Sequence, residues 1–220
     1  MCMATVIPRE SKRITYSSEI RALKLVPFTA EQISIVKGSL LGDACLHTSW
    51  PGTSKNFVFS KMHSVKQREY IEWVYTKLQP FVRKQPRLYA PTQSLRLRTI
   101  SHSALTALMS EFYPEGKKVL PSCVDSIMTD PLALAVWFMD DGNVVRNEGK
   151  WKGYHLNTQS FTYDEHIVLS GLFEKIHGIH PIIEKNNGSY RIGIWQRKSR
   201  EKFRDIITPH ILPSMRYKLG

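Results

Sequence analysis

Residues 132–143, Leu-Ala-Leu-Ala-Val-Trp-Phe-Met-Asp-Asp-Gly-Asn, are the stretch from which the fold can be predicted. Asp130 can cap a helix here and Pro131 can open it, so the apolar run that follows predicts a buried helix. The run ends in Asp140 and Asp141, followed by a glycine. We therefore expect two carboxylates at the C-terminal end of a buried helix.

The same design occurs earlier in the chain. Residues 35–46 read Ile-Val-Lys-Gly-Ser-Leu-Leu-Gly-Asp-Ala-Cys-Leu, an apolar run with small residues and an acid at its end. A shift of 98 positions places Asp43 on Asp141 and Gly42 on Asp140. The chain is therefore predicted to be internally duplicated.

The two runs are also suited to close packing. Gly38 and Gly42 are four residues apart and lie on one face of the first helix. Without side chains there, a second helix can approach backbone to backbone, and the second run offers Ala135 and Val136. A close helix pair between two halves is expected.

These segments resemble the paired signature helices of the LAGLIDADG homing endonucleases, in the single-chain form where one polypeptide carries both motifs. The likeness is closest to the intron-encoded yeast mitochondrial type, because Trp-Phe-Met-Asp-Asp-Gly at 137–142 precedes Leu-Asn-Thr-Gln-Ser-Phe-Thr at 156–162. It extends from about Thr29 to the C-terminus. The resemblance implies an α+β fold of two pseudo-symmetric αββαββα halves, each with a four-stranded antiparallel DNA-binding sheet, joined by a two-helix motif interface.

The charge balance points to a polyanionic partner. The 220 residues include 31 Lys plus Arg against 19 Asp plus Glu, giving a formal net charge of +12 and a pI of about 9.7. Such a balance is typical of nucleic-acid binding, with an anionic membrane surface as the second choice. A hydrophobic content of 42% supports a folded protein of one large domain or two fused halves.

Other composition features favour an intracellular protein without a membrane span. No run approaches the roughly 18 to 20 apolar residues that a spanning helix needs, and residues 1–9 lack the apolar core of a secretory signal. Cys2, Cys45 and Cys123 have no spacing suited to zinc, so we expect free thiols in a reducing compartment. A mitochondrion, a chloroplast or a bacterial cytoplasm would fit.

The order of patterns along the chain predicts the division into parts. Residues 1–28 form a basic N-terminal arm, either laid on nucleic-acid phosphates or solvated; 29–119 form the first half, 120–129 a short linker and 130–220 the second half. In the first half we expect a helix from residue 30, a hairpin of 46–50 and 56–63 turning at Pro51-Gly52, a helix over 65–82, a hairpin within 87–100 and a helix over 102–113. In the second half we expect a hairpin of 143–150 and 153–160, a helix over 163–177, a hairpin of 181–185 and 189–195, and a helix over 198–207.

Several local signals support these elements. Thr29 with Gln32, and Thr162 with Glu165, fit capping boxes at helix starts. Asn187-Gly188 suits a tight hairpin turn. The last hairpin should then place Tyr190, Ile192 and Ile194 toward the core, and Arg191, Gly193 and Trp195 on the open face.

Asp43 and Asp141 are the candidate catalytic acids. A lone acid at a helix end is most often solvated, but duplication at matched positions favours function. The resemblance implies that both bind Mg²⁺ or Mn²⁺ and that each half cuts one strand; oxygen ligands suit such cations, which stabilise charge during phosphodiester hydrolysis. The preceding residues, Gly42 and Asp140, complete the expected metal-binding positions, with Asp140 in a supporting role because glycine stands at its counterpart.

Further catalytic candidates are two lysines and a glutamine. Lys118 and Lys218 lie 75 and 77 residues beyond their acids, and Lys117 is the rival for the first position. By resemblance, these lysines would lie near the scissile phosphates, where an ammonium can stabilise developing charge. Gln159, also by resemblance, would order water near the metals. His177 and His180 are expected to mark a helix end rather than a metal pair.

A major groove is wide enough for β-ribbons, so the cationic faces of the two sheets are expected to lie along DNA. Phosphate contacts should dominate affinity and make it depend on salt. The candidate contacts are Lys55, Lys61, Arg87, Arg96 and Arg98 in the first half and Lys150, Lys152, His155, Lys185 and Arg191 in the second. Arg191 is the best single candidate for a base contact; phosphate contact or plain solvation is the alternative for each member.

The predicted function is a monomeric, metal-dependent endonuclease that makes a staggered double-strand break in a long, asymmetric DNA site. Asymmetry is expected because the halves differ in sequence. The alternative is a group I intron RNA maturase, which would bind its host intron RNA on the same sheets. A DNA-binding regulator is a third reading, for which no helix-turn-helix pattern is evident.

Overall fold

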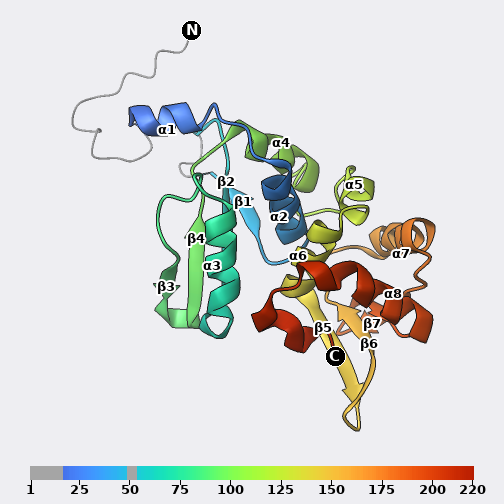
Figure 1. The fold of residues 1–220 in the computed structure, drawn as a ribbon. Coiled ribbons are helices and arrows are strands. Elements are labelled where there is room, and N and C mark those ends of the chain that lie inside the picture. Colours follow the sequence, from blue (N-terminus) through green and yellow to red (C-terminus); the bar gives the residue numbers. More distant parts are fainter. Residues whose placement is uncertain (1–16, 49–53) are drawn as a thin grey trace.

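The computed structural model describes residues 17–48 and 54–220. These form two α+β halves with a central pair of helices between their sheets (Figure 1). The first half contains α2 (Ala30–Leu41), β1 (Cys45–His47), β2 (Val58–Ser64), α3 (Arg68–Lys77), β3 (Arg87–Tyr89), β4 (Ser94–Arg98) and α4 (Ser103–Phe112). The second half contains α6 (Pro131–Asp141), β5 (Gly142–Asn147), β6 (Lys150–Leu156), α7 (Tyr163–His177), β7 (Ile182–Asn186), β8 (Ser189–Ile194) and α8 (Arg197–Ile207). The predicted αββαββα order, twice, is confirmed.

Each half builds one four-stranded antiparallel sheet with the same topology. The strand orders are β1-β2-β4-β3 and β5-β6-β8-β7. Because side chains alternate across a strand, one face of each sheet packs on helices while the other stays open. Leu95 and Leu97 are buried in the first sheet, and Ile192 and Ile194 in the second, so the helix-covered faces carry the core.

The motif helices α2 and α6 pack against each other in the centre of the molecule (Figure 1). A Cβ atom on Gly38 would lie 2.3 Å from the carbonyl oxygen of Ala133 and 3.0 Å from the Cβ of Val136. A Cβ on Gly42 would lie 2.5 Å from the Cβ of Asp140. The predicted close approach is therefore confirmed, with Ala133 rather than Ala135 facing the first glycine.

Local capping explains where the helices begin. Thr29 accepts from the backbone N–H of Gln32, whose side chain accepts from the backbone of Thr29, completing the predicted capping box of α2. The reciprocal pair Thr162 and Glu165 does the same for α7. Asp130 accepts from the first backbone N–H groups of α6, as predicted. Each bond satisfies a backbone donor that a helix start leaves unpaired.

The hairpin after α6 differs from the expectation in its turn. β5 ends at Asn147 and β6 begins at Lys150, so the turn comes before Lys150 rather than after it. Glu148 and Gly149 supply the two positive φ angles, 50° and 72°, that a two-residue hairpin turn needs. The Asn187-Gly188 turn between β7 and β8 was predicted correctly, with φ angles of 49° and 81°.

The predicted linker and arm contain structure of their own. Within 120–129, α5 (Val124–Met128) packs against α6 and α7, so this segment is a helical connection. In the arm, α1 (Ser18–Leu23) buries Ile20 against Phe81 and Ile100 of the first half. Residues 1–16 of the arm and the expected Pro51-Gly52 turn lie outside the described residues. None of the described helices is both long enough and apolar enough to cross a membrane.

Candidate active site and nucleic-acid surface

The two candidate acids meet where the motif helices end. α6 stops at Asp141, and Gly42 caps α2 directly before Asp43. The backbone N–H of Asp43 donates to Oδ2 of Asp140 at 3.4 Å, which brings the two helix ends together. The side chain of Asp43 is 45% exposed, whereas Asp141 is half-buried. The two acids, which are far apart in the sequence, therefore come together where the motif helices end.

Burial and mutual repulsion act on Asp141. Burial raises the pKa of its carboxyl group, the charges of Asp43 and Asp140 raise it further, and the result is a pKa of about 7. Lys118 and Lys218 oppose the shift without cancelling it. A carboxylate so placed gains from any added positive charge, because a cation relieves the repulsion that protonation otherwise relieves.

The two lysines hold matched positions at the helix ends. Lys118 Nζ donates to the carbonyl oxygens of Leu41 at 3.0 Å and Gly42 at 2.8 Å. Lys218, in the 3₁₀ helix Pro213–Lys218, donates to the carbonyl oxygens of Met139 at 2.5 Å and Asp140 at 3.1 Å. Each carbonyl that accepts from Lys118 has a counterpart 98 positions later that accepts from Lys218. The duplication seen in the sequence therefore extends to these contacts. Lys117, the rival for the first position, is exposed.

The lysine contacts have a structural role and a chemical one. Carbonyls in the last turn of a helix lack intrahelical partners, and an ammonium satisfies them while interacting well with the helix dipole. Burial lowers the pKa of both lysines, while the charges of Asp43, Asp140 and Asp141 raise it. The ammonium groups are therefore fixed beside the acids rather than free in solvent.

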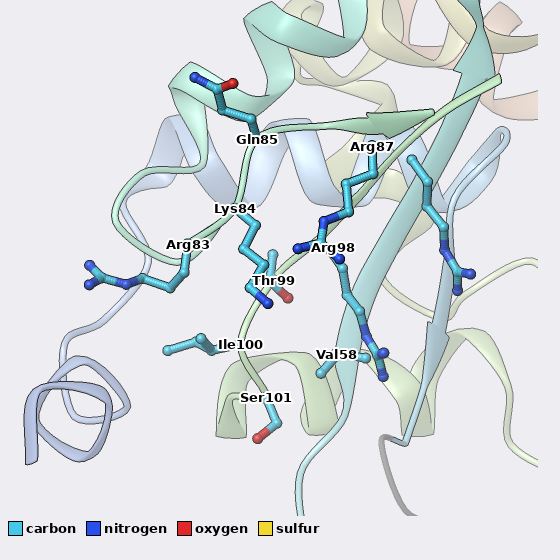
Figure 2. A pocket seen from close by; sticks show the side chains of 10 residues that line it. Val58, Arg83, Lys84, Gln85, Arg87, Arg98, Thr99, Ile100 and Ser101 are labelled. Carbon is cyan, nitrogen blue, oxygen red and sulfur yellow. The ribbon is translucent and has the colours of Figure 1, made fainter. Parts of the chain in front are cut away.

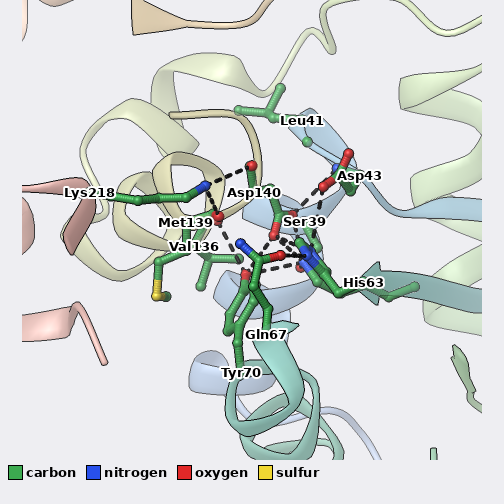
Figure 3. A network of polar contacts seen from close by, with 12 residues as sticks. Ser39, Leu41, Asp43, His63, Gln67, Tyr70, Val136, Met139, Asp140 and Lys218 are labelled. Atoms are coloured by element: carbon green, nitrogen blue, oxygen red, sulfur yellow. Dashed lines mark hydrogen bonds and ion pairs between the residues drawn. The ribbon is translucent and has the colours of Figure 1, made fainter. Parts of the chain in front are cut away.

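Asp140 is the centre of a buried polar network (Figure 3). Lys61 Nζ lies 2.6 Å from Oδ1 and 2.5 Å from Oδ2, the hydroxyl of Tyr70 donates to Oδ1 at 2.7 Å, and His63 Nε2 lies 3.0 Å from Oδ1. Burial alone would raise the pKa of Asp140, but Lys61 and His63 outweigh it and hold the pKa at about 2. The carboxylate is ionised and joins the first half to α6.

The network corrects two expectations. Lys61 is 1% exposed and points to the helices, so it is wrong as a DNA contact. Asp140 was expected to support metal binding, and its side chain does lie with Asp43 and His63 in a group whose ligand atoms fall within 4.8 Å of one another. However, the Lys61 ammonium already neutralises this carboxylate, so the Asp140 side chain is a poor ligand for a second cation.

The remaining oxygen donors fit a hard divalent cation. They are the carboxylates of Asp43 and Asp141 and the helix-end carbonyls of Gly42 and Asp140. Each carbonyl oxygen accepts from a lysine but has two lone pairs, so one acceptor position remains. Carboxylate and carbonyl oxygens are the ligands that Mg²⁺ and Mn²⁺ prefer. The donor chemistry thus agrees with the expected metal-binding positions.

The predicted glutamine is not the residue that contacts the acids' backbone. Gln159 is half-buried in the turn after β6. Asn157, two residues earlier, donates through Nδ2 at 2.8 Å to the carbonyl oxygen of Asp141. His177 is the last residue of α7, as predicted, and its Nε2 lies 2.7 Å from the carbonyl oxygen of Met128.

The open face of the first sheet is cationic, as its alternation predicted. Cross-strand partners share a face, and Arg98 pairs with Ser60 while Arg96 pairs with Met62 and with Arg87. All three arginines are exposed. Lys55, in the segment before β2, is exposed as well.

A pocket of about 420 Å³ extends this face (Figure 2). It lies between β4 and the α3–β3 connection, and none of the described residues that line it is acidic. Its cationic side chains are Arg83, Lys84, Arg87, Arg96 and Arg98. Arg83 and Lys84 were missed in the sequence because they fall between elements, where no periodic pattern marks a face.

The open face of the second sheet carries a mixed set of charges. Arg191 lies there opposite Glu184, and His155 lies opposite Gly193, as the register requires. Lys150 and Lys152 are exposed near the β5–β6 turn. Lys185 pairs with Tyr190, which contacts Tyr163 and His166 of α7, so Lys185 lies on the helix side of the sheet. The prediction that Lys185 contacts DNA from the open face is therefore wrong.

Comparison with known proteins agrees with this architecture. Residues 33–203 match the LAGLIDADG DNA endonuclease family. Cytochrome b mRNA maturase bI2 of Saccharomyces cerevisiae is 29% identical over 211 residues, which is 88% of this chain and 48% of that protein. Probable intron-encoded endonuclease 1 of Wickerhamomyces canadensis is 29% identical over 198 residues, covering 83% of this chain and 80% of that protein.

Structural comparison extends the similarity to nearly the whole chain. The homing endonuclease I-WcaI bound to its DNA recognition sequence matches with a TM-score of 0.83 and 25% identity, over 99% of this chain and 96% of that chain. The chain spans about half the length of the Saccharomyces cerevisiae maturase. The match to residues 33–203 covers well over half of the sequence, so the chain belongs to the LAGLIDADG DNA endonuclease family.

Proposed function

We propose that this protein is a homing endonuclease that binds a long, asymmetric duplex site and hydrolyses one phosphodiester bond in each strand, leaving staggered ends. The observation that carries the proposal is the pair Asp43 and Asp141 at the seam between two sheets, with a lysine fixed at each helix end. The likeness to an endonuclease bound to its recognition sequence supports DNA as the partner. Action as a monomer follows from the two halves being parts of one chain.

The site residues divide the chemistry between them. Asp43 and Asp141, with the carbonyls of Gly42 and Asp140, would hold Mg²⁺ or Mn²⁺, which supplies positive charge at the phosphate and acidifies bound water. Lys118 and Lys218 are held by the helix-end carbonyls, so their charge is available to offset the negative charge that develops on phosphate oxygens. Gln159 is proposed to orient water in the second half.

The test uses substitutions that keep side-chain shape. Asp43→Asn and Asp141→Asn should each abolish double-strand cleavage of a site selected from a randomised duplex library in Mg²⁺, while DNA binding is retained. Asp205→Asn, at an exposed position of α8, is the matched control and should cleave like the unmodified protein. Full double-strand cleavage by both active-site variants would sink the proposal, as would cleavage without divalent metal.

A maturase activity is the second candidate, favoured by the relatives that are named cytochrome b mRNA maturases. Those names also favour a mitochondrion among the expected compartments. A maturase binds and folds RNA without needing the acid pair, so splicing of a candidate intron should survive Asp43→Asn and Asp141→Asn. A splicing assay run beside a DNA nicking assay separates the two activities: nicking that depends on the acids supports the endonuclease, and splicing that does not supports the maturase.

A further inference from the structure

Glu184 is an acid on the open face of the second sheet, in its edge strand β7, on a surface proposed to bind DNA. Its Oε2 accepts from Arg191 Nε at 2.9 Å, and its Oε1 accepts from Trp195 Nε1 at 2.5 Å. His155 Nε2 lies 3.2 Å from the same carboxylate, and its ring meets the Trp195 ring edge-on with centroids 5.1 Å apart. One carboxylate on β7 thus gathers side chains from β6, from β8 and from the residue that follows β8.

The strands are shaped to hold this group. Glu184 and Arg191 are direct cross-strand partners. A Cβ atom on Gly193 would lie 2.5 Å from Trp195 Nε1 and 2.6 Å from Glu184 Oε1. Since the neighbours could not keep these positions beside any larger residue, the glycine is what allows Trp195 and Glu184 to meet over the sheet.

The charge of Glu184 needs an explanation. Affinity for DNA comes mainly from cations on phosphates, and an acid that neutralises Arg191 works against it. Among the described residues no acid lines the pocket on the first sheet, although Glu19 of α1 pairs with one of its cations, Arg83. An acid on the second open face that pairs with Arg191 therefore offers something other than affinity.

The contact with Glu184 orients the guanidinium group of Arg191. The bond to Glu184 engages the Nε edge of the Arg191 guanidinium, and the edge with the two terminal nitrogens is the one that can pair with guanine O6 and N7. The Arg191 side chain is 25% exposed, so it is anchored at its base and open at its tip. Fixing a planar fork before binding removes an entropic cost and favours one base over others.

We propose that Glu184, itself held by the Nε1–H of Trp195, is a positioning residue that orients Arg191 for direct reading of guanine in the major groove. This rests on the proposed DNA-binding function and deepens it by assigning sequence specificity to one cluster. The cluster then contributes selectivity at one or two adjacent base pairs of the site rather than overall affinity.

The experiment compares base preferences position by position. Unmodified protein, Arg191→Ala, Glu184→Ala and the double variant are each used to select bound duplexes from a randomised library without added divalent metal, and bound and unbound pools are sequenced. Arg191→Ala should lower the preference for guanine at one or two positions by roughly 5- to 100-fold. Glu184→Ala should lower it at the same positions, and the double variant no further than Arg191→Ala.

Two more variants separate positioning from charge and from folding. Glu184→Gln keeps an acceptor oxygen but loses the charge, so it should keep most of the guanine preference while binding all sequences more tightly at low salt. Glu201→Ala breaks the Arg197–Glu201 pair on α8, whose Nε–Oε1 distance is also 2.9 Å, and should leave the profile unchanged. Thermal unfolding of every variant checks that the fold is retained.

The outcomes are distinct for this inference and for the proposed function. A profile that Glu184→Ala leaves unchanged, or one flattened equally at all positions, overturns the positioning role. Gly193→Ala should flatten the same positions as Glu184→Ala, and preserved guanine preference there would also count against it. If the unmodified protein enriches no DNA motif at all, the proposed function itself fails, whatever the variants do.

Discussion

Asp140 and Asp141 are neighbours in the sequence with opposite electrostatic environments. Lys61 and His63 hold the pKa of Asp140 at about 2 against its burial, whereas burial and two nearby carboxylates raise that of Asp141 to about 7. Of these two adjacent acids, Asp140 is neutralised by side chains inside the protein and Asp141 is not. This difference supports Asp140 as a residue of the packed interior and Asp141 as the residue proposed for the reaction.

The raised pKa of Asp141 predicts that this carboxyl group lowers the stability of the folded protein at high pH. In the folded protein Asp141 keeps its proton up to about pH 7, whereas in the unfolded chain the same carboxyl group releases it near pH 4. The stability that this difference gives below about pH 4 is therefore lost as the pH rises through about 7. Asp141→Asn should therefore be more stable than the unmodified protein at pH 8, by up to about 4 kcal/mol, and similar near pH 4. Urea unfolding without divalent metal at both pH values measures this, with Asp205→Asn as control. A difference that does not change with pH would contradict the expectation.

The buried pair Lys61 and Asp140 predicts strong coupling between two halves of the chain. Lys61→Met leaves an unpaired buried carboxylate and should cost about 3 to 5 kcal/mol. Asp140→Asn leaves an unpaired buried ammonium and should cost a comparable amount. The double variant should lose much less than the sum, which urea unfolding of all four proteins determines. Additive losses would mean that the two side chains contribute independently.

At the scale of elements, the sequence predicts those features that depend on local patterns. Capping boxes gave the starts of α2 and α7, and alternation on β8 placed Arg191 and Ile192 on opposite faces correctly. The same alternation was available for β2, where Lys61 has the parity of the buried Phe59, and applying it would have placed Lys61 inside. Its basic character alone suggested a surface contact.

Contacts between distant segments could not be predicted in this way. Asp140 lies 79 residues beyond Lys61 and 70 beyond Tyr70, and only the packing of α6 against the first half brings them together. The contact of Asn157 with the backbone of Asp141 likewise depends on how the chain turns after β6. Duplication indicated the acids and the lysines because it repeats a local pattern; Lys61, His63 and Tyr70 have no such repeat.

Close packing of α2 on α6 predicts a specific sensitivity to side-chain size. Gly38→Ala would place a Cβ 2.3 Å from the carbonyl oxygen of Ala133, so the helices must separate, at a cost of about 1 to 3 kcal/mol. Gly171→Ala is the matched control, since it is an exposed helical glycine in α7 with open space around it, and it should stabilise by about 0.5 to 1 kcal/mol. Thermal unfolding distinguishes them, and equal shifts would contradict the tight helix pair.

At the scale of the whole molecule, the two open faces that are proposed to bind DNA differ in their charges. The first carries a pocket lined by five cationic side chains, of which Arg83 is paired with Glu19 of α1, while the second carries Arg191 paired with Glu184. Counterion release rewards uncompensated cations, so the first half should supply more of the salt-dependent binding. The second half, by this reasoning, contributes less affinity for each arginine and more discrimination.

The unequal faces predict where the salt dependence of binding arises. Lys84 and Arg87 line the pocket on the first half, and the double variant Lys84→Ala/Arg87→Ala should weaken binding to all sequences similarly. If both side chains contact phosphates, the slope of log K against log salt should become shallower by roughly 2, at about 0.9 per lost contact. The control Lys175→Ala/Lys198→Ala removes the same charge from exposed positions in α7 and α8, on the helix-covered side, and should change the slope little. Equal effects of the two double variants would show that net charge, rather than the cationic face of the first sheet, sets the affinity.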